Sequence, residues 1–328
     1  MTALGALGHQ GYLSCVKEVT WGIDPGSGYT SQMITQESLK TKVNYLMGKP
    51  IANTREITQQ KVPGGISAGG AINFDVDVEG LLGQALKGIL PSETYASLGA
   101  GNGGSHIFVP TTDATLIPSY SFLVSRDANV ATNVWDFVGS TFDQLSLTGT
   151  EGQVLKATAT VSCKNGTSGA TGVTPTYTTQ MPLVYHTGTF TVGGASVPLK
   201  SAKVDIKSGN FNKRGFLGSR YIQRQLAGGI EVSGEIEAYF TDQSLVNDYL
   251  NGTDAIISLE FDGTALGTST RKLILLIPVA QFTGETPNVA SATAEIMLKL
   301  PFTAWLSGAG SPNHLIQATL INSQQAAY

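Results

Sequence analysis

The chain has 328 residues, enough for one large all-β domain or two ordinary ones, and only 13% of them are charged, where about 25% is typical of soluble globular proteins. Glycine (39 residues), serine and threonine take the place of the missing charges, which favours many strands and turns and much surface buried in an assembly. The net charge of −4 argues against a protein that grips nucleic acid through phosphate contacts, which need clustered Lys and Arg.

Membrane, secretion and disulfide signals are missing from the sequence. The longest apolar run, Leu273–Ile277, has the length of a strand and falls far short of the ~20 residues of a membrane-spanning helix. Met1–Gly8 lacks the basic start and long apolar core of a signal peptide, so we expect none. Cys15 and Cys163 are too few and too distant for a disulfide framework, and we expect free thiols in a reducing cytoplasm.

In the first half of the chain, hydrophobic periodicity predicts strands separated by a long polar loop. Leu39–Tyr45 alternates apolar and polar residues, the pattern of a strand with one buried face. A helix-like stretch at 78–87 places Leu82 and Leu86 on one apolar face, with Asp77 as the expected N-cap. In chain order we predict a strand at 39–45, a polar segment at 48–60, a strand at 66–76, the helix at 78–87 and a final antiparallel pair at 142–148 and 154–163.

The second half repeats this order of elements. Its helix-like stretch at 242–250 carries Leu245 and Leu250 as packing residues, as Leu82 and Leu86 do in the first half. The predicted elements are a strand at 202–207, a polar segment at 208–225, a strand at 230–240, the helix at 242–250 and a final pair at 272–282 and 290–302.

The letters of the sequence repeat as well as the pattern. Gly64–Phe74 reads like Gly228–Ala238 at an offset of 164, which is half the length of the chain. A repeat at this spacing indicates a duplicated structural unit. We therefore predict two tandem domains, at 1–164 and 165–328.

The chain resembles the bacteriophage tail tube (major tail protein) family in three segments. Gly11–Gly22 is similar to that family's opening, a glycine and a strand followed by a Lys-Glu-x-Thr-x-Gly turn. Lys203–Asn210 resembles the strand that leads into the family's long loop, and Gly229–Phe240 resembles its central strand. The resemblance implies a mainly β fold of two tandem tail-tube-like β-sandwich or half-barrel domains, each with a short packing helix, assembling into a shared β-barrel ring.

The function implied by the resemblance is structural. Rings stack into a hollow conduit that holds the tape measure protein and passes DNA into the host. The implied partners are copies of the chain itself, the tape measure protein, the tail terminator and baseplate or tip proteins, with transient, non-specific passage of DNA. No catalytic, cofactor-binding or metal-binding residues are expected, and the protein is expected in the virion tail after assembly in the bacterial host cytoplasm.

Duplication bears on the symmetry of such a ring. Tube rings of this family typically hold six domains, so a chain with two domains favours rings of three copies with pseudo-sixfold symmetry. A ring of six chains remains an alternative if only one half of each chain builds the barrel. The sequence does not separate these two arrangements.

Two polar loops are candidates for contacts between stacked rings, at 47–60 and 208–225. Their basic residues are interpreted either as partners of carboxylates on the adjacent ring or as solvated hairpin tips. These candidates are Lys49, Arg55, Lys213, Arg214, Arg220 and Arg224.

Other polar motifs give weaker evidence for a function. Asp75, Asp77 and Glu79 alternate with valines, so on a strand they would form an acidic stripe, either on the surface or in a lumen where like charge keeps DNA from sticking. A cation site is the less favoured interpretation of these carboxylates. Gly99–Gly104 is interpreted as a flexible linker, because a dinucleotide-binding loop needs a strand before it and a helix after it.

Three other functions remain open from sequence alone. The inner tube of a contractile injection device would share the same fold. A receptor-binding or other tail structural protein of the virion would share the Gly/Thr/Ser-rich β composition. A β-sandwich glycosidase would need two carboxylates about 5–10 Å apart in a cleft, and the sequence points to no such pair.

Overall fold

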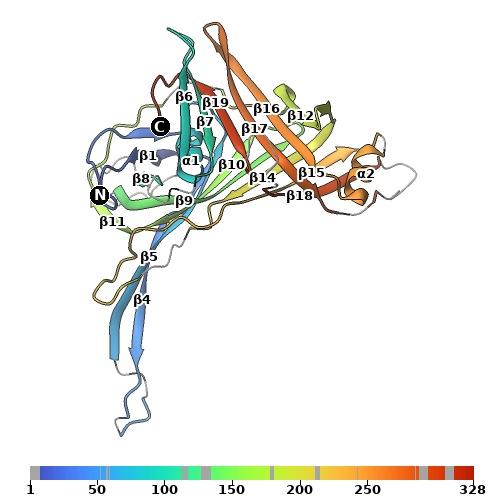
Figure 1. Cartoon of the computed structure of the whole chain (residues 1–328). Helices are drawn as coiled ribbons and strands as arrows, with labels where there is room; N and C mark the ends of the chain where they lie inside the picture. The colour runs from blue at the N-terminus through green and yellow to red at the C-terminus, as the bar shows by residue number, and fades with distance from the viewer. Residues whose placement is uncertain are drawn as a thin grey trace.

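The structure is a computed structural model of the whole chain, and it is mainly antiparallel β (Figure 1). The prediction of a mainly β fold is confirmed. The residues that it describes are 8–51, 53–56, 58, 60–111, 113, 117–126, 134–177, 181–210, 215–241, 243–284, 286–287, 295–306 and 314–328.

The main sheet is one antiparallel layer that runs through both halves of the chain. The first-half strands lie in the order β4–β5–β10–β9, and the second-half strands continue in the same order, β14–β15–β18–β17. The two sets meet where β9 pairs with β14, with Gln144 opposite Lys207. The strands of this sheet are β3 (Gln36–Glu37), β4 (Lys40–Gly48), β5 (Gln60–Asp75), β9 (Val134–Thr150), β10 (Lys156–Cys163), β14 (Leu199–Lys207), β15 (Glu231–Tyr239), β17 (Ser269–Phe282) and β18 (Met297–Ala304).

Each strand of the main sheet buries one face and leaves the other polar, as the alternating sequence predicts. On the core face, Ile72, Leu145, Val204 and Ile236 are buried side by side with other aliphatic residues. The opposite face carries a mixture of lysines, carboxylates and hydroxyl groups. Its charged members are Lys40, Lys42, Asp75, Lys156, Lys203, Asp205, Lys207, Glu231, Glu235, Glu237 and Lys299.

Two outer sheets cover the core face, and long strands connect them to the main sheet. The first half of β9 pairs with β8 and β11 in one outer sheet, while its second half pairs with β10 and β14 in the main sheet. β17 joins the other outer sheet to β18 in the same manner. The outer strands are β1 (Tyr12–Lys17), β2 (Thr30–Gln32), β8 (Tyr120–Ser125) and β11 (Asn165–Ala170) in the first, and β6 (Ser92–Ser97), β7 (Gly104–Val109), β12 (Gly188–Val192), β13 (Ala195–Ser196), β16 (Ala255–Leu266) and β19 (Gln317–Asn322) in the second.

The second outer sheet contains strands from both halves of the chain. β19 lies between β17 and β7, so the first-half hairpin β6–β7 extends the second-half sheet. Gly99–Gly104, expected to be a flexible linker, forms the turn of this hairpin. Gly103 has a φ of 72° and lies so close to Asn322 that a Cβ would come within 1.9 Å of the Asn322 carbonyl oxygen.

One short α-helix follows the central strand of each half, α1 after β5 and α2 after β15. α1 (Leu81–Ile89) is almost entirely buried, and its Gly83 lies against the ring of Tyr328. α2 (Ser244–Asn251) buries only Leu245 and Val246. Two 3₁₀ turns complete the described elements, η1 (Gly8–Gln10) and η3 (Tyr185–Thr187). Neither α1 nor α2, the α-helices of the described residues, is long and apolar enough to cross a membrane.

The expected helix cap at Asp77 is replaced by a separate turn. α1 begins at Leu81, later than predicted, and its N-cap position is Gly80, without a side-chain cap. Asp77 Oδ1 instead accepts a hydrogen bond from the Glu79 backbone N–H at 2.9 Å. The carboxylate therefore caps the turn that precedes the helix rather than the helix itself.

Candidate assembly surfaces

A two-stranded arm projects from the body of the molecule (Figure 1). β4 and β5 stay paired from Lys40 opposite Gly69 to Gly48 opposite Gln60, beyond the point where the other strands of the main sheet end. The predicted stacking loop at 47–60 is the tip of this arm. Lys49 and Arg55 are exposed there, while Ala52, Ile57 and Gln59 lie outside the described residues.

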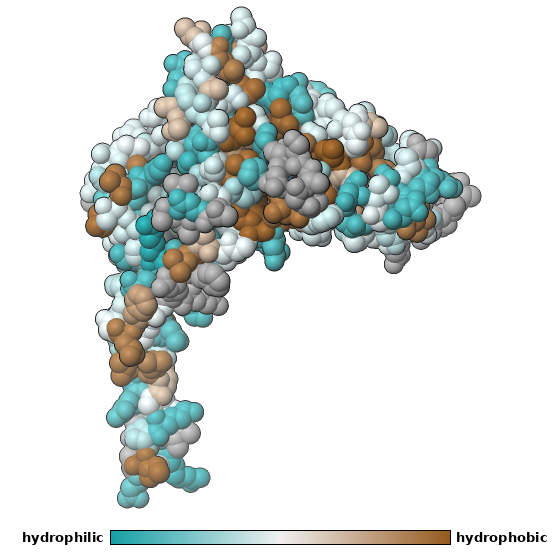
Figure 2. All heavy atoms as spheres, viewed as in Figure 1, coloured by the Kyte–Doolittle hydropathy of each residue, from teal (hydrophilic) through white to brown (hydrophobic). Residues whose placement is uncertain are grey.

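The arm exposes apolar as well as basic side chains, and Figure 2 shows brown patches along its length. Ile51 is fully exposed, and the other large apolar residues are about half exposed. Apolar surface of this kind on a two-stranded projection is costly in water and is typical of a contact surface. The arm residues concerned are Tyr45, Leu46, Met47, Ile51 and Val62.

The second predicted stacking loop, at 208–225, takes a different course. Its described residues run back along the base of the arm, where the Ile66 N–H donates to the Arg220 carbonyl at 2.8 Å. Arg220 Nε donates in turn to the Gly64 carbonyl at 2.9 Å. We call residues 215–226 the strap. Arg224 lies at its end, within 3.5 Å of the Ile117 carbonyl, whereas Lys213 and Arg214 fall outside the described residues.

Glycines explain why the second half makes a strap instead of an arm. The β14–β15 ladder ends at Lys207 opposite Glu231. Just beyond it the backbones of Gly209 and Gly228 approach so closely that a Cβ on Gly228 would lie 1.8 Å from the Gly209 carbonyl oxygen. Gly209 also has a φ of 54°, a conformation that favours glycine. The chain therefore leaves the strand direction at this point.

The outer edge of the main sheet lies at β3 and β4 and is covered by side chains. The Leu39 N–H donates to Glu37 Oε2 at 2.8 Å, and the Leu39 carbonyl accepts from Arg126 Nη2. Arg126 and Glu37 also form an ion pair at 2.9 Å. Natural sheets often cover an edge in this way, because unpaired backbone groups promote association. Neither Glu37 nor Arg126 stands out in the sequence, because no motif or fixed spacing connects the two residues.

The three carboxylates proposed as one stripe separate in the structure. Asp75 ends β5 on the polar face of the main sheet, opposite Lys156. Asp77 and Glu79 lie after the strand, in the turn before α1, so strand alternation no longer applies to them. Burial is the main cause that raises the pKa of Asp77. The described residues contain no group of three potential metal ligands.

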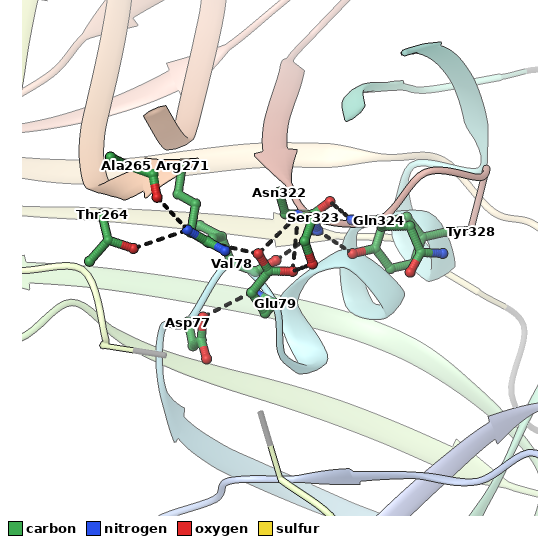
Figure 3. Close-up of polar contacts among 10 residues, drawn as sticks. All are labelled: Asp77, Val78, Glu79, Thr264, Ala265, Arg271, Asn322, Ser323, Gln324 and Tyr328. Atoms are coloured by element: carbon green, nitrogen blue, oxygen red, sulfur yellow. Dashed lines mark hydrogen bonds and ion pairs between the residues drawn. The ribbon is translucent and has the colours of Figure 1, made fainter. Parts of the chain in front are cut away.

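Glu79 joins distant parts of the chain (Figure 3). Its carboxylate accepts from Arg271 Nε of β17 at 2.7 Å and from the backbone and hydroxyl of Ser323. Both members of the ion pair are nearly buried, with 12% of Arg271 and 6% of Glu79 exposed. Asn322 beside them donates to the Val78 carbonyl at 2.8 Å. This cluster fastens the turn before α1 to the second outer sheet, a contact that sequence spacing does not reveal.

The predicted packing residues differ between the helices. Leu82 and Leu86 of α1 are completely buried. Leu245 of α2 is 9% exposed, but Leu250 is 61% exposed and does not contribute to the core. The letters of the repeat align Leu250 with Leu86, whereas α2 uses Val246 as its second buried residue.

Neither cysteine is available for surface chemistry. Cys15 and Cys163 are free and fully buried. Burial is the largest cause that raises the pKa of both thiols, to about 12 for Cys163. The expectation of free thiols agrees with these buried, unpaired cysteines.

The opening motif of the chain is held by one buried carboxylate. Glu18 accepts from the backbone N–H groups of Gly22 (2.7 Å) and Gly139 (2.6 Å) and from the hydroxyls of Ser119 (2.6 Å) and Ser121 (2.8 Å). Four donors satisfy the two carboxylate oxygens. The Lys-Glu-x-Thr-x-Gly turn is therefore a structural element of the first outer sheet.

Comparison with known proteins identifies the family. A family model described as phage tail tube protein matches residues 8–304. A search of curated proteins finds no match. The family match covers most of the chain, including the arm, the strap and every strand of the main sheet. The chain therefore belongs to the phage tail tube protein family, whose members are structural proteins of the virion tail.

Proposed function

We propose that the chain builds a phage tail tube by forming rings that stack into a hollow conduit, with the polar face of the main sheet lining the lumen. The observation that carries this proposal is the one-sided main sheet, which spans both halves with a polar open face and an outer edge at β3–β4. Such a sheet removes its edge by closing with other copies into a barrel. The core face is already covered by the outer sheets, so the polar face is the one left for a wet channel.

The charge of this face suits passage of DNA and of a tape measure protein. Lysines and carboxylates alternate on it, and several pair with each other, as Lys203 does with Asp205 at 2.8 Å and Lys299 with Glu235 at 3.0 Å. A balanced, hydrated surface binds a polyanion weakly, because strong binding needs an excess of Lys and Arg. Asp75 is the member of the proposed acidic stripe that would face this lumen.

The repeated order of strands supports a proposal for the composition of the ring. We propose that residues 1–164 and 165–328 are two copies of one tube unit, supported by the matching orders β4–β5–β10–β9 and β14–β15–β18–β17. Both sets lie in the same sheet, which favours rings of three chains with pseudo-sixfold symmetry over rings of six chains. Mass-per-length measurement on tubes separates the two arrangements.

The arm is proposed as the contact between successive rings. It extends along the strand direction, and it carries Lys49, Arg55 and the exposed apolar residues. A contact of one end of a subunit with the opposite end of the next is heterologous and generates an open filament. Tail terminator and baseplate or tip proteins are proposed to cover the two ends of that filament.

Negative-stain microscopy of the purified full-length protein tests the proposal. Hollow tubes or stacked rings are expected as concentration rises. A particle that stays monomeric and forms neither rings nor tubes, at any concentration or salt, would overturn it. A compact trimer that never stacks and adheres to host cells would favour the receptor-binding alternative instead.

A further inference from the structure

A groove lies at the junction between the two halves of the chain. One wall is the end of the main sheet, where the Glu151 N–H donates to the Lys200 carbonyl at 2.9 Å and extends the pairing of β9 with β14. The other wall is the edge of the second outer sheet, formed by β12, β13 and β16. The groove has a volume of about 320 Å³, so it can receive a few side chains but not a folded domain.

The groove has an apolar lining and a charged rim. Leu259 and Phe261 of β16 line it and are nearly buried, and a Cβ on the neighbouring Gly188 would come within 2.8 Å of the Phe261 ring. Glu151 is exposed at the rim, where its carboxylate accepts from the Tyr239 hydroxyl at 2.9 Å. A concave apolar surface beside an exposed carboxylate favours an apolar segment that also carries a positive charge.

The groove and the arm lie at opposite ends of the main sheet (Figure 1). β14 runs between these ends. Ser201, opposite Thr150, borders the groove. Lys207, opposite Gln144, lies toward the arm, because β10 and β5 continue that row of neighbours to Ala71. Copies stacked in one direction therefore bring the arm of one copy to the groove end of the next.

The arm is long enough to pass out of its own ring. β10 stops at Cys163, opposite Ala68, and the β4–β5 ladder continues from Ala68 to Gln60 with the strap along its base. At about 3.4 Å per residue this part of the ladder is about 27 Å long. The tip therefore lies well away from the end of the sheet and is available to another copy.

The tip carries the side chains that the groove favours. Met47 and Ile51 are exposed apolar residues, and the exposed Lys49 lies between them in the sequence. Exposure of these apolar side chains costs free energy in the unassembled chain, and burial in a groove recovers it. Lys49 provides a positive charge for Glu151.

The numbers of arms and grooves match. Each chain has one junction between its halves, and in the described part of the second half the strap takes the place of a second arm. Every arm in a stack therefore has one groove to occupy, whether a ring holds three chains or six.

We propose that the arm tip of one copy docks in the groove of a copy in the next ring. Ile51 lies against the β13 wall beside Ser196, and Lys49 lies beside Glu151 on the wall formed by the main sheet. The inference rests on the proposed tube function and adds to it the surface that receives the arm.

Filling the groove tests the proposal. Ser196 is exposed and lines the groove, so Ser196→Trp places a large side chain where the arm tip would dock. We expect free rings with an unchanged melting temperature and at least about tenfold fewer tubes in negative stain. Ser196→Ala, which leaves the groove open, is the matched control and should form tubes at the unmodified level. Normal tubes from Ser196→Trp would overturn the inference.

Engineered disulfides test the contact directly, because a disulfide forms only where two Cα atoms lie within about 7 Å of each other. The variant Ile51→Cys/Ser196→Cys is assembled, oxidised and separated on a non-reducing gel, with the buried Cys15 and Cys163 contributing little background. We expect a ladder of covalent oligomers that continues beyond the number of chains in one ring, because contacts between rings do not close on themselves.

A matched pair controls for random collision of the arm tip. Ile51→Cys/Thr167→Cys uses an exposed residue of β11, a strand that lies beside β4 and β5 at the arm end of the molecule. We expect at least about tenfold less cross-linking from this pair. Equal cross-linking by the control pair, or well-formed tubes without a cross-link from the groove pair, would contradict the docking.

The same samples separate this inference from the proposed function. Tubes that form in spite of Ser196→Trp, or without the Ile51–Ser196 cross-link, remove the groove as the docking surface and leave the tube function standing. If the unmodified protein forms neither rings nor tubes, the proposed function and the inference fail together.

Discussion

The arm and the strap begin as the same pair of strands and end as different structures. In both halves the ladder starts in the register of the repeat, with Lys42 opposite Ser67 and Lys207 opposite Glu231. The first half then continues the ladder to Gly48, whereas the second half breaks it where Gly209 approaches Gly228. Two segments related by the 164-residue offset thus share a register in the sheet while their connections differ, as a projection in one half and a brace in the other. The comparison predicts which parts of each half are needed for folding and which for assembly.

The largest effect is expected from shortening the arm. Replacing residues 49–59 with a two-residue Asn-Gly turn removes the tip and leaves the main sheet intact. Because the described residues of the tip are exposed, the melting temperature should change little, while tube formation is lost and free rings accumulate. Negative-stain microscopy and thermal melts measure the two results. Tubes of normal length from this variant would exclude the arm as the contact between rings.

The next largest effect is expected from the cluster around Glu79, which differs between the two halves. The repeat places Gln243 at the position of Glu79, so only the first half has this carboxylate. Glu79→Ala leaves the nearly buried guanidinium of Arg271 without its carboxylate and should lower the free energy of unfolding by about 3–5 kcal/mol. Glu235→Ala is the control, since its pair with Lys299 is exposed and contributes less than about 1 kcal/mol. Urea denaturation measures both, and equal losses would contradict the assigned difference.

The two helices provide a matched pair of substitutions. Leu86→Ala leaves a cavity in the core and should cost about 2–5 kcal/mol. Leu250→Ala, at the position that aligns with it, removes an exposed side chain and should change stability by less than about 0.5 kcal/mol. Chemical denaturation of both variants at one pH gives the comparison. A large loss from Leu250→Ala in the unassembled chain would place that residue in a contact that the structure lacks.

Carboxylates in the first outer sheet make its stability depend on pH. Burial, followed by the nearby Asp24 and Glu18, raises the pKa of Asp136 to about 7. Between about pH 4 and pH 7 the unfolded chain therefore loses this proton while the folded chain keeps it, so stability falls as pH rises.

Asp136→Asn removes this dependence. The variant should match the unmodified protein near pH 4 and exceed it by about 1 kcal/mol above pH 7, a value reduced for the partial exposure of the site. Asp205→Asn is the control of opposite sign, because burial there is outweighed by hydrogen bonds from Lys203 and Ser146 that lower the Asp205 pKa. Thermal melts across pH measure both. A gain for Asp136→Asn that is independent of pH would contradict the assignment.

The smallest effect is expected where the strap braces the arm. Arg220→Ala removes the hydrogen bond to the Gly64 carbonyl and should cost about 0.5–1 kcal/mol locally. Hydrogen exchange at the Ile66 amide, which donates to the Arg220 carbonyl, reports the loosening. Arg55→Ala at the arm tip should leave that amide unchanged. Equal exchange in both variants would mean that the Arg220 side chain does not hold the strap.

Local patterns in the sequence were sufficient for the mainly β fold and for the family. Period-two alternation at Leu39–Tyr45 and the offset between Gly64–Phe74 and Gly228–Ala238 depend on neighbours along the chain, and the family match confirms the mainly β tube protein that they indicated. Such signals are local because one buried face imposes its period on each strand.

Only the tertiary structure decided how the two halves differ. The strap, the Glu79–Arg271 pair and the Glu37–Arg126 cover on the β4 edge all join residues far apart in the sequence, and Leu250 is exposed although its alignment with Leu86 predicts packing. Their partners are selected by how strands cross and where backbones approach, as at Gly209 and Gly228. Side-chain contacts between distant segments leave no period in the sequence, and so the fold had to bring them together before they could be recognised.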